Sequence, residues 1–211
     1  MTRHAPGTIV FRGRTDQPRF ALTFDDGPSD CTSGLLDLLE RRGVKATFFM
    51  VGSEVESHRD VARAVRDTGH EIGLHSMAHL NHDDDADAAL ADVREGADTI
   101  EHLLGVRLSL FRAPYGHFVL STLLESERRG WTPIYWSAWG LDWLETEVPQ
   151  SIADRAIADL APGAIVLLHD GRRQKPMHCS RMLEALELIL DEAERRGLEP
   201  VTVGELLGIE S

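Results

Sequence analysis

The sequence has little cysteine and a shortage of positive charge. Its 211 residues include two cysteines, Cys31 and Cys179, and no C-x-x-C pair, so a zinc site built from cysteine thiolates is excluded. We expect two free thiols, with a disulfide as the alternative. Lysine and arginine total 22 against 35 aspartate and glutamate residues, a formal net charge of -13. A surface this acidic repels phosphate backbones, which argues against nucleic acid as a partner.

Long apolar runs are also missing. The sequence has no stretch of uninterrupted apolar residues long enough to span a bilayer, so we expect no contact with a membrane. The first residues, Met1 to Gly7, contain no apolar core of signal-peptide length. We therefore expect a cytoplasmic protein, or an extracellular one if a leader has been removed. Nothing in the sequence points to a protein partner.

What is present is an ordinary globular composition. Apolar residues make up 42% of the chain and charged residues 27%, which excludes a disordered chain and a disulfide-dense mini-protein. Short runs rich in β-branched and aromatic residues alternate with amphipathic runs of helical spacing, which predicts an α/β fold with a parallel sheet. Seven strands are expected: Phe20–Phe24, Ala46–Val51, Glu71–Leu74, Leu108–Arg112, Pro133–Ala138, Ala164–Leu168 and Pro200–Val203.

Charged and imidazole side chains gather where the predicted strands end. In parallel α/β folds the carboxyl ends of the strands carry the active site. Five such clusters therefore predict one shared site, and hence an enzyme. The clusters are Asp25 with Asp26, His75, Arg112 to Gly116, Asp142 with Trp143, and His169 with Asp170.

Two histidines in this set have metal-binding spacing. His75 and His79 are four residues apart, so on a helical turn they share a face and can hold one metal ion. Asp26 would add a carboxylate, which leaves a zinc ion one open position. Two surface histidines are the alternative. His70, which precedes its strand, and His82, which opens an acidic stretch, are not expected to join the site.

The carboxylate pair Asp25–Asp26 follows an apolar strand. Adjacent residues of an extended chain point in opposite directions, so both can serve one site only if the turn at Gly27 aims them. A plain turn or helix cap is the alternative. Arg112 lies at the end of a predicted buried strand and needs a carboxylate partner, for which Asp25 is the natural candidate.

The last cluster is built around His169. A lone histidine at a strand end is more often structural than catalytic. Asp142 offers it a carboxylate partner that would fix its tautomer and keep it protonated.

Five short motifs occur in order along residues 23 to 169. They are Thr23-Phe24-Asp25-Asp26-Gly27-Pro28, His75-Ser76-x-x-His79, Arg112-x-Pro114-Tyr115-Gly116, Asp142-Trp143 and Leu167-x-His169. Together they resemble the signature motifs of the polysaccharide deacetylases, carbohydrate esterase family 4, a family of chitooligosaccharide and peptidoglycan deacetylase-like domains.

This resemblance implies a single-domain, distorted (β/α) barrel, with residues 1–18 as an N-terminal extension and residues 19–208 as the catalytic domain. It implies metal-dependent removal of N-acetyl groups from N-acetylglucosamine-type saccharides, with one divalent ion, zinc or else cobalt or nickel. It also implies roles for individual residues. The metal ligands would be Asp26, His75 and His79. Asp25 would be the base, positioned by Arg112, and His169 would be the acid, tuned by Asp142. The backbone N–H of Tyr115 would be the oxyanion donor, and the substrate contacts would be Trp143, Leu167, Pro114 and Trp139.

One position departs from the family pattern. The fourth motif usually reads Asp-x-x-Asp-Trp, and this chain has Trp139 in place of the first Asp. We expect Trp139, with Trp136 nearby, to present a stacking face to a sugar; a core tryptophan is the alternative. Two other functions stay open: deacylation of a small intracellular N-acyl metabolite, and carbohydrate binding without catalysis.

Overall fold

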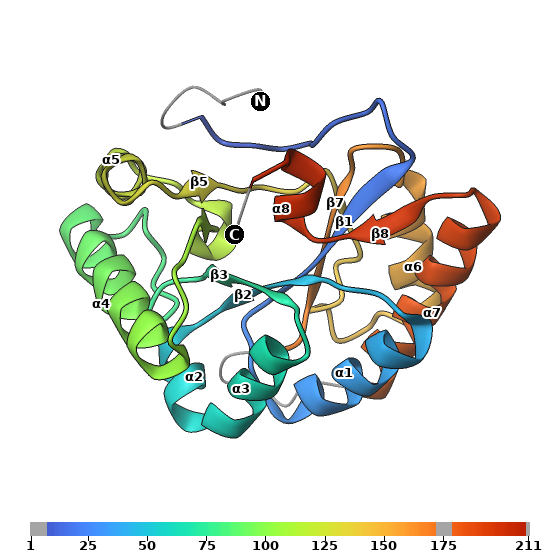
Figure 1. Ribbon diagram of the computed structural model, residues 1–211, viewed down its shortest axis with the longest axis horizontal. Coiled ribbons are helices and arrows are strands. Elements are labelled where there is room, and N and C mark those ends of the chain that lie inside the picture. The colour runs from blue at the N-terminus through green and yellow to red at the C-terminus, as the bar shows by residue number, and fades with distance from the viewer. Residues whose placement is uncertain (1–7, 172–178, 210–211) are drawn as a thin grey trace.

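The computed structural model describes residues 8–171 and 179–209 and confirms the predicted α/β architecture (Figure 1). The described residues form one curled sheet of parallel strands in the order β5-β4-β3-β2-β1-β7-β6, and β8 pairs with the first half of β1. The strands are β1 (Arg19–Asp25), β2 (Thr47–Met50), β3 (Glu71–Leu74), β4 (Leu110–Phe111), β5 (Thr132–Pro133), β6 (Ala138–Trp139), β7 (Ile165–His169) and β8 (Glu199–Val201).

Helices form an arc around the outside of the sheet, from α5 through α4, α2, α3, α1 and α7 to α6 (Figure 1). Among the described helices none is long and apolar enough to cross a membrane. The helices are α1 (Asp30–Arg42), α2 (Gly52–Ser57), α3 (Arg59–Asp67), α4 (Ala86–Leu104), α5 (Leu120–Arg129), α6 (Pro149–Ala158), α7 (Cys179–Arg195) and α8 (Val203–Leu207), with a short 3-10 helix, η1, at Pro114–Gly116.

The expected strand over 133–138 is wrong in its middle, and the reason explains the distortion of the barrel. Its two ends are separate strands at opposite edges of the sheet, because β5 pairs with β4 whereas β6 pairs with β7. The residues between them carry the chain across the gap. There the N–H of Tyr135 donates to the carbonyl of Val10, and the N–H of Ser137 donates to the carbonyl of Ile165.

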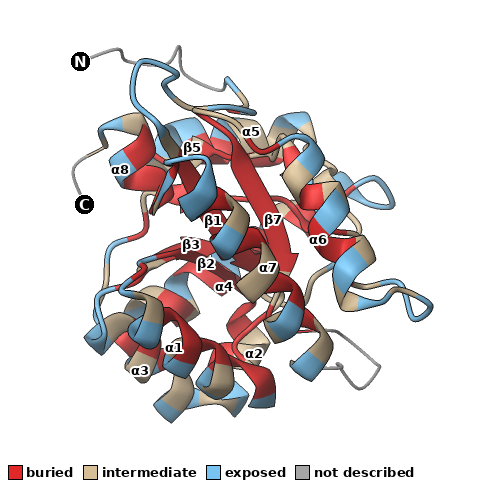
Figure 2. Cartoon of the chain, turned by 90° about the vertical axis from the view of Figure 1, so that its right-hand side faces the viewer, coloured by how far each residue is buried: buried red, intermediate tan, exposed pale blue. Residues whose placement is uncertain are grey.

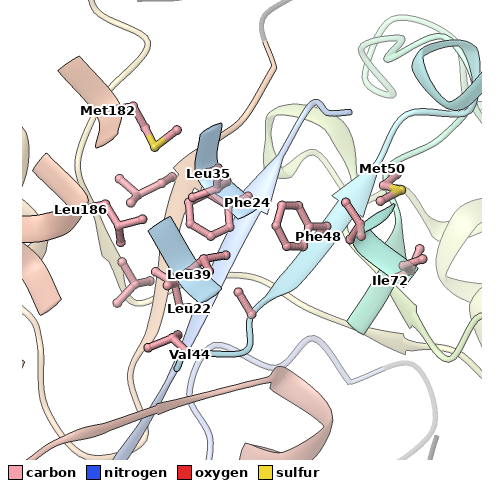
Figure 3. Close-up of a cluster of buried hydrophobic side chains, with 14 of the residues drawn as sticks. Leu22, Phe24, Leu35, Leu39, Val44, Phe48, Met50, Ile72, Met182 and Leu186 are labelled. Atoms are coloured by element: carbon pink, nitrogen blue, oxygen red, sulfur yellow. The ribbon is translucent and has the colours of Figure 1, made fainter. Parts of the chain in front are cut away.

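The alternation of side chains along each strand divides the core into two parts. Phe20, Leu22 and Phe24 of β1 face the helices and pack in the large outer cluster, part of which is shown in Figure 3. Ala21 faces the barrel interior with residues such as Phe49 and Ile165. β1 and β7 are accordingly buried along most of their length (Figure 2). Because the pattern has a period of two, Thr23 and Asp25 must also face the interior.

The helix α8 closes the end of the barrel at which the strands begin. Its residues Val203 and Leu206 belong to the interior cluster, and the N–H of Gly204 donates to the Glu71 carboxylate at the start of β3. The described part of the N-terminal extension runs past the open edge, where Val10 bridges Ile134. The candidate site residues lie at the other end of the barrel, at the carboxyl ends of the strands.

The two cysteines form a disulfide, so the expectation of two free thiols is wrong. Cys31 in the first turn of α1 is bonded to Cys179 at the start of α7, with 5.2 Å between their Cα atoms. Cys31 does not line the candidate site. The pairing follows from the sheet: β1 and β7 are neighbours, and the helices that come after them lie side by side (Figure 1).

Candidate active site

Inward-facing residues at the ends of β1 and β7 form the floor of the site. Asp25 and His169 are register partners in the β1–β7 ladder. Both point into the barrel, because Phe24 and Leu168 beside them pack outward against the helices. The strand alternation that builds the core therefore also brings the predicted base and the predicted acid to one end of the barrel.

Arg112 follows β4 and is fully buried beside Asp25. Its Nη1 donates to Asp25 Oδ1 at 2.7 Å and to Thr23 Oγ1 at 2.8 Å, and its Nη2 donates to the carbonyl of Tyr135 at 3.0 Å. The guanidinium also lies 4.1 Å from the centre of the Phe49 ring. The predicted Arg112–Asp25 pair is thus present, and several partners hold it.

The turn after β1 aims the neighbouring carboxylates differently from the prediction. Asp26 itself takes the left-handed backbone, with φ of 73°, and not Gly27. A Cβ on Gly27 would lie 2.1 Å from a carboxylate oxygen of Asp170. Gly27 is therefore needed for close packing, and the bend at Asp26 lets both carboxylates reach one site.

The three predicted metal ligands converge. Asp26 Oδ1 lies 3.4 Å from His75 Nε2 and 3.0 Å from His79 Nε2, and the ligand atoms of all three lie within 4.8 Å of one another. His75 Nδ1 donates to the carbonyl of Arg112 at 2.7 Å, which leaves the lone pair on Nε2 and is typical of a metal-bound histidine. Asp26 Oδ1 is buried and has no hydrogen-bond donor among the described residues. This donor set fits a divalent cation such as zinc.

The expected helical turn between His75 and His79 is wrong. Residues 75–81 form an irregular loop, in which Ser76 and His79 both have positive φ. Asp92 of α4 holds this loop by accepting from the N–H of Ala78, and Ser76 Oγ accepts from the N–H of His79. The two rings meet because the loop coils back on itself, and not because of the helical repeat.

Strained backbone is concentrated around the site. In the described chain the non-glycine residues with positive φ lie in the loops that carry the candidate residues, and such strain is typical of functional loops. These residues are Asp26, Ser76, His79, Tyr115 and Leu141.

His169 is held by Asp142 at two points. Asp142 Oδ2 accepts from the backbone N–H of His169 and Oδ1 from its Nδ1, both at 2.8 Å. Burial disfavours a charged imidazole, but the carboxylate of Asp142, aided by Asp26 and Asp25, outweighs it and raises the pKa of His169 to about 9. The Asp142 carboxylate therefore favours the protonated imidazole, which is the form that a general acid requires.

These groups surround a cavity of about 300 Å³ with an aromatic wall. Trp139 is 39% exposed, so it is not a core tryptophan. Rings follow one another from Trp136 to Trp139 and Trp143 and on to His169, with centroids 5.9, 5.6 and 5.1 Å apart. The lining residues are Asp25, Asp26, His75, His79, Tyr115, Gly116, Trp136, Trp139, Trp143, Leu167 and His169.

Three predicted residues lie behind this lining. Arg112 and Asp142 contact Asp25 and His169 from behind, which agrees with supporting roles. Pro114 is buried at the start of η1 and does not line the cavity, so the structure gives it no contact position for a substrate. His70 and His82 are separate from the ligand set, as predicted; burial lowers the pKa of each to about 4.

Two residues that the sequence analysis mentioned, but did not count among the site residues, contact the site in the structure. Trp136 lines the cavity, although its sequence signal was only its closeness to Trp139. Asp170 is buried and accepts from Thr32 Oγ1, and its burial raises the pKa of Asp170 to about 7. Its place directly after His169 was the available signal. The Asp170 carboxylate packs against the turn at Gly27.

The fold and the site define a (β/α)-barrel protein with a candidate metal and acid–base centre at the carboxyl ends of its strands. The sequence pattern of the family described as polysaccharide deacetylase matches residues 12–134. The chain is 34% identical over 206 residues, 95% of this chain and 93% of the relative, to a peptidoglycan-N-acetylglucosamine deacetylase of Bacillus cereus. It therefore belongs to the polysaccharide deacetylase family, carbohydrate esterase family 4.

Other relatives agree with this assignment. A chitooligosaccharide deacetylase of Rhizobium leguminosarum bv. trifolii is 36% identical over 159 residues, 74% of each chain. A solved peptidoglycan N-acetylglucosamine deacetylase, in complex with 4-naphthalen-1-yl-N-oxidanyl-benzamide, gives a TM-score of 0.89 at 26% identity, covering 96% of this chain and 94% of that one. The family also contains pseudoenzymes. In this chain all six polar candidates are present: Asp25, Asp26, His75, His79, Asp142 and His169.

Proposed function

We propose that the protein is a metal-dependent deacetylase that removes N-acetyl groups from N-acetylglucosamine-type saccharides. The observation that carries this proposal is the convergence of a buried carboxylate, a metal-ligand set and a histidine paired with Asp142 on one cavity. Amide hydrolysis needs those three functions: a proton acceptor for water, charge stabilisation at the carbonyl oxygen and a proton donor for the amine.

The ligand set Asp26, His75 and His79 would hold one divalent ion, zinc or else cobalt or nickel. Such an ion supplies Lewis-acid polarisation of the amide carbonyl and lowers the pKa of water. Asp25 accepts the proton of the attacking water. Arg112 holds Asp25 in place from the rear of the pocket, so that its second oxygen, 3.8 Å from His75 Nε2, faces the metal ligands.

His169 completes the reaction at the leaving group. Water oxygen bonds to the carbonyl carbon, the C–N bond breaks, and His169 gives its proton to the nitrogen, so that acetate and a free amine result. The amine leaves only when protonated, and Asp142 keeps His169 in the form that can donate. Tyr115 has a positive φ, and its ring lies against the His79 ring; its backbone N–H would donate to the oxyanion.

The cavity wall supports a sugar substrate. Trp143 and Leu167 border the reaction centre and would enclose the acetyl methyl group. Trp139 presents an exposed ring at the rim, where an apolar face of a pyranose can stack. The relatives named for peptidoglycan and chitooligosaccharide deacetylation support the same substrate class. The net charge of -13 favours neutral oligomers over anionic polymers.

The disulfide bears on where the protein works. A cytoplasmic location stays a prediction from the sequence, but disulfides persist in oxidising compartments and are rare in the cytosol. The Cys31–Cys179 bond therefore supports the other expectation, and we infer that the protein functions outside the reducing cytosol.

A substrate panel tests the proposed function. Acetate release is measured from N-acetylglucosamine oligomers of increasing length and, in parallel, from small N-acetylated metabolites. The proposal expects release from the oligomers with a higher kcat/KM than from the small amides. Release from the small amides alone would contradict it, and so would no release from either set by protein that carries a full equivalent of metal.

A further inference from the structure

The loop between β6 and α6 carries two residues of the proposed machinery, Asp142 and Trp143, but has no regular secondary structure over residues 140–148. Its turns are closed by few backbone hydrogen bonds of its own, such as that from the N–H of Leu144 to the carbonyl of Leu141. Leu141 is held at a φ of 56°. A loop of this kind needs outside contacts to keep Asp142 on His169.

Arg181 provides these contacts from the first turn of α7. Its Nη1 donates to the carbonyls of Glu145 at 2.8 Å and Glu147 at 3.0 Å, and its Nη2 donates to the carbonyl of Asp142 at 3.3 Å. A guanidinium suits this task because its donors have a fixed planar arrangement that can reach several carbonyls at once.

Arg155 of α6 contacts the same loop through other atoms. It donates to the Glu147 carboxylate at 2.6 Å and to the carbonyl of Gly140 at 3.4 Å. Arg155 thus secures the two ends of the loop to the helix that follows it. Arg181 differs because it reaches the loop from α7, far along the chain, and contacts Asp142 directly.

The first turn of α7, which carries Arg181, is itself fixed to the site. Two residues before it, Cys179 is bonded to Cys31 of α1. The start of α1 is in turn tied to the residue after His169, because Thr32 Oγ1 donates to the Asp170 carboxylate and Ser29 Oγ donates to its carbonyl. Arg181 therefore links the Asp142 loop to the strand end that carries His169.

We propose that Arg181 is a positioning residue for the Asp142–His169 pair. The inference rests on the proposed function, in which this pair delivers the proton to the leaving amine. Without the guanidinium, the loop loses the three hydrogen bonds that Arg181 donates to it, and Asp142 no longer holds the imidazole in one orientation. Small displacements of this kind cost much activity because proton transfer requires hydrogen-bond geometry.

The test uses Arg181→Met, Arg181→Lys and a matched control, Arg195→Met. Arg195 lies on the same helix, is exposed, and within the described residues pairs with Glu192. We expect Arg181→Met to lower kcat/KM by roughly 10- to 100-fold, as loss of supporting contacts does elsewhere. Arg181→Lys keeps the charge but lacks the planar guanidinium, so its kcat/KM should lie between those of the wild type and Arg181→Met. The control should have the kcat/KM of the wild type.

A double-mutant cycle with Asp142→Asn separates positioning from general destabilisation. If Arg181 acts through Asp142, Arg181→Met should change kcat/KM by less than about 2-fold when Asp142 is already Asn. The same loss in both backgrounds would overturn the proposal, as would an unchanged kcat/KM in Arg181→Met. If Arg181→Met melts below the assay temperature, Arg181→Lys decides by the same cycle.

A second readout does not depend on activity. Cleavage by a glutamate-specific protease after Glu145 and Glu147 reports how firmly the loop is held. Cleavage there should be faster in Arg181→Met than in the wild type and unchanged in Arg195→Met; equal rates in all three would overturn the proposal. Because this assay needs no substrate, it still tests the role of Arg181 if the wild-type protein releases no acetate and the proposed function fails.

Discussion

Asp25 and His169 are direct partners in the register of β1 and β7, and each faces a group of opposite charge. Asp25 receives Nη1 of Arg112 at 2.7 Å, and His169 Nδ1 meets Asp142 Oδ1 at 2.8 Å. Two titratable groups with opposite partners suit opposite roles, a proton acceptor and a proton donor. Parallel pairing of two neighbouring strands thus places the proposed base beside the proposed acid.

Replacing Asp25 with Asn tests its role as the base. The amide keeps the size of the side chain but accepts no proton from water, so kcat should fall by about 100-fold or more. Metal content should stay at the wild-type level, because Asp25 is not one of the three ligands. Asp30→Asn on the exposed first turn of α1 is the matched control. Wild-type turnover in Asp25→Asn would remove Asp25 as the base.

The pH dependence of kcat tests the acid pair. His169 donates only when protonated, so activity should fall as the pH rises through its pKa of about 9. A cation at Asp26 disfavours the protonated imidazole, so the alkaline limb should lie at or below that pH. Asp142→Asn removes the charge that raises the pKa of His169, and the limb should move to lower pH. An alkaline limb that stays in place in this variant would contradict the assignment.

Much of the site was predictable because it depends on the strands. The alternation along β1 and β7 determines which residues face the barrel, and the carboxyl ends of parallel strands converge. Asp25, Arg112, Asp142 and His169 were paired in the prediction as they are in the structure. These pairs also have chemical logic, since a buried arginine needs a carboxylate.

What could not be predicted depends on irregular backbone and on distant parts of the chain. The approach of His75 to His79 results from two positive-φ residues that no spacing rule describes. The Cys31–Cys179 bond and the contacts of Arg181 depend on where α7 packs, which no local pattern specifies. The break in the expected strand over 133–138 has the same origin, because its two ends pair at opposite edges of the sheet and no local pattern specifies that pairing.

Trp139 should affect substrate binding more than chemistry. Trp139→Ala removes the exposed ring at the rim, and the KM for longer oligomers should rise roughly 3- to 10-fold, which corresponds to about 1 kcal/mol of stacking. The kcat should change little, because the ring does not touch the reacting atoms. Leu124→Ala, at a more exposed apolar residue on α5, is the control. An unchanged KM for every oligomer would refute a stacking role.

The disulfide should contribute substantially to stability. It joins residues 148 positions apart, and closing so long a loop stabilises the folded state by up to roughly 5 kcal/mol in the chain-entropy account. The double variant Cys31→Ser with Cys179→Ser should therefore unfold at lower urea concentration, and reductant should no longer change its midpoint. Two reactive thiols in unreduced, denatured wild-type protein would contradict the bond itself.

The most direct test of the central claim follows acetate release from N-acetylglucosamine oligomers through removal and return of the metal. The protein is assayed as purified, after chelation and dialysis, and after one equivalent of zinc or cobalt is restored, with His75→Ala carried through the same steps. We expect release by the wild type to vanish on chelation and to return with the metal, and no metal uptake by His75→Ala. Release that survives complete removal of the metal, or stoichiometric zinc in His75→Ala, would contradict the proposed centre.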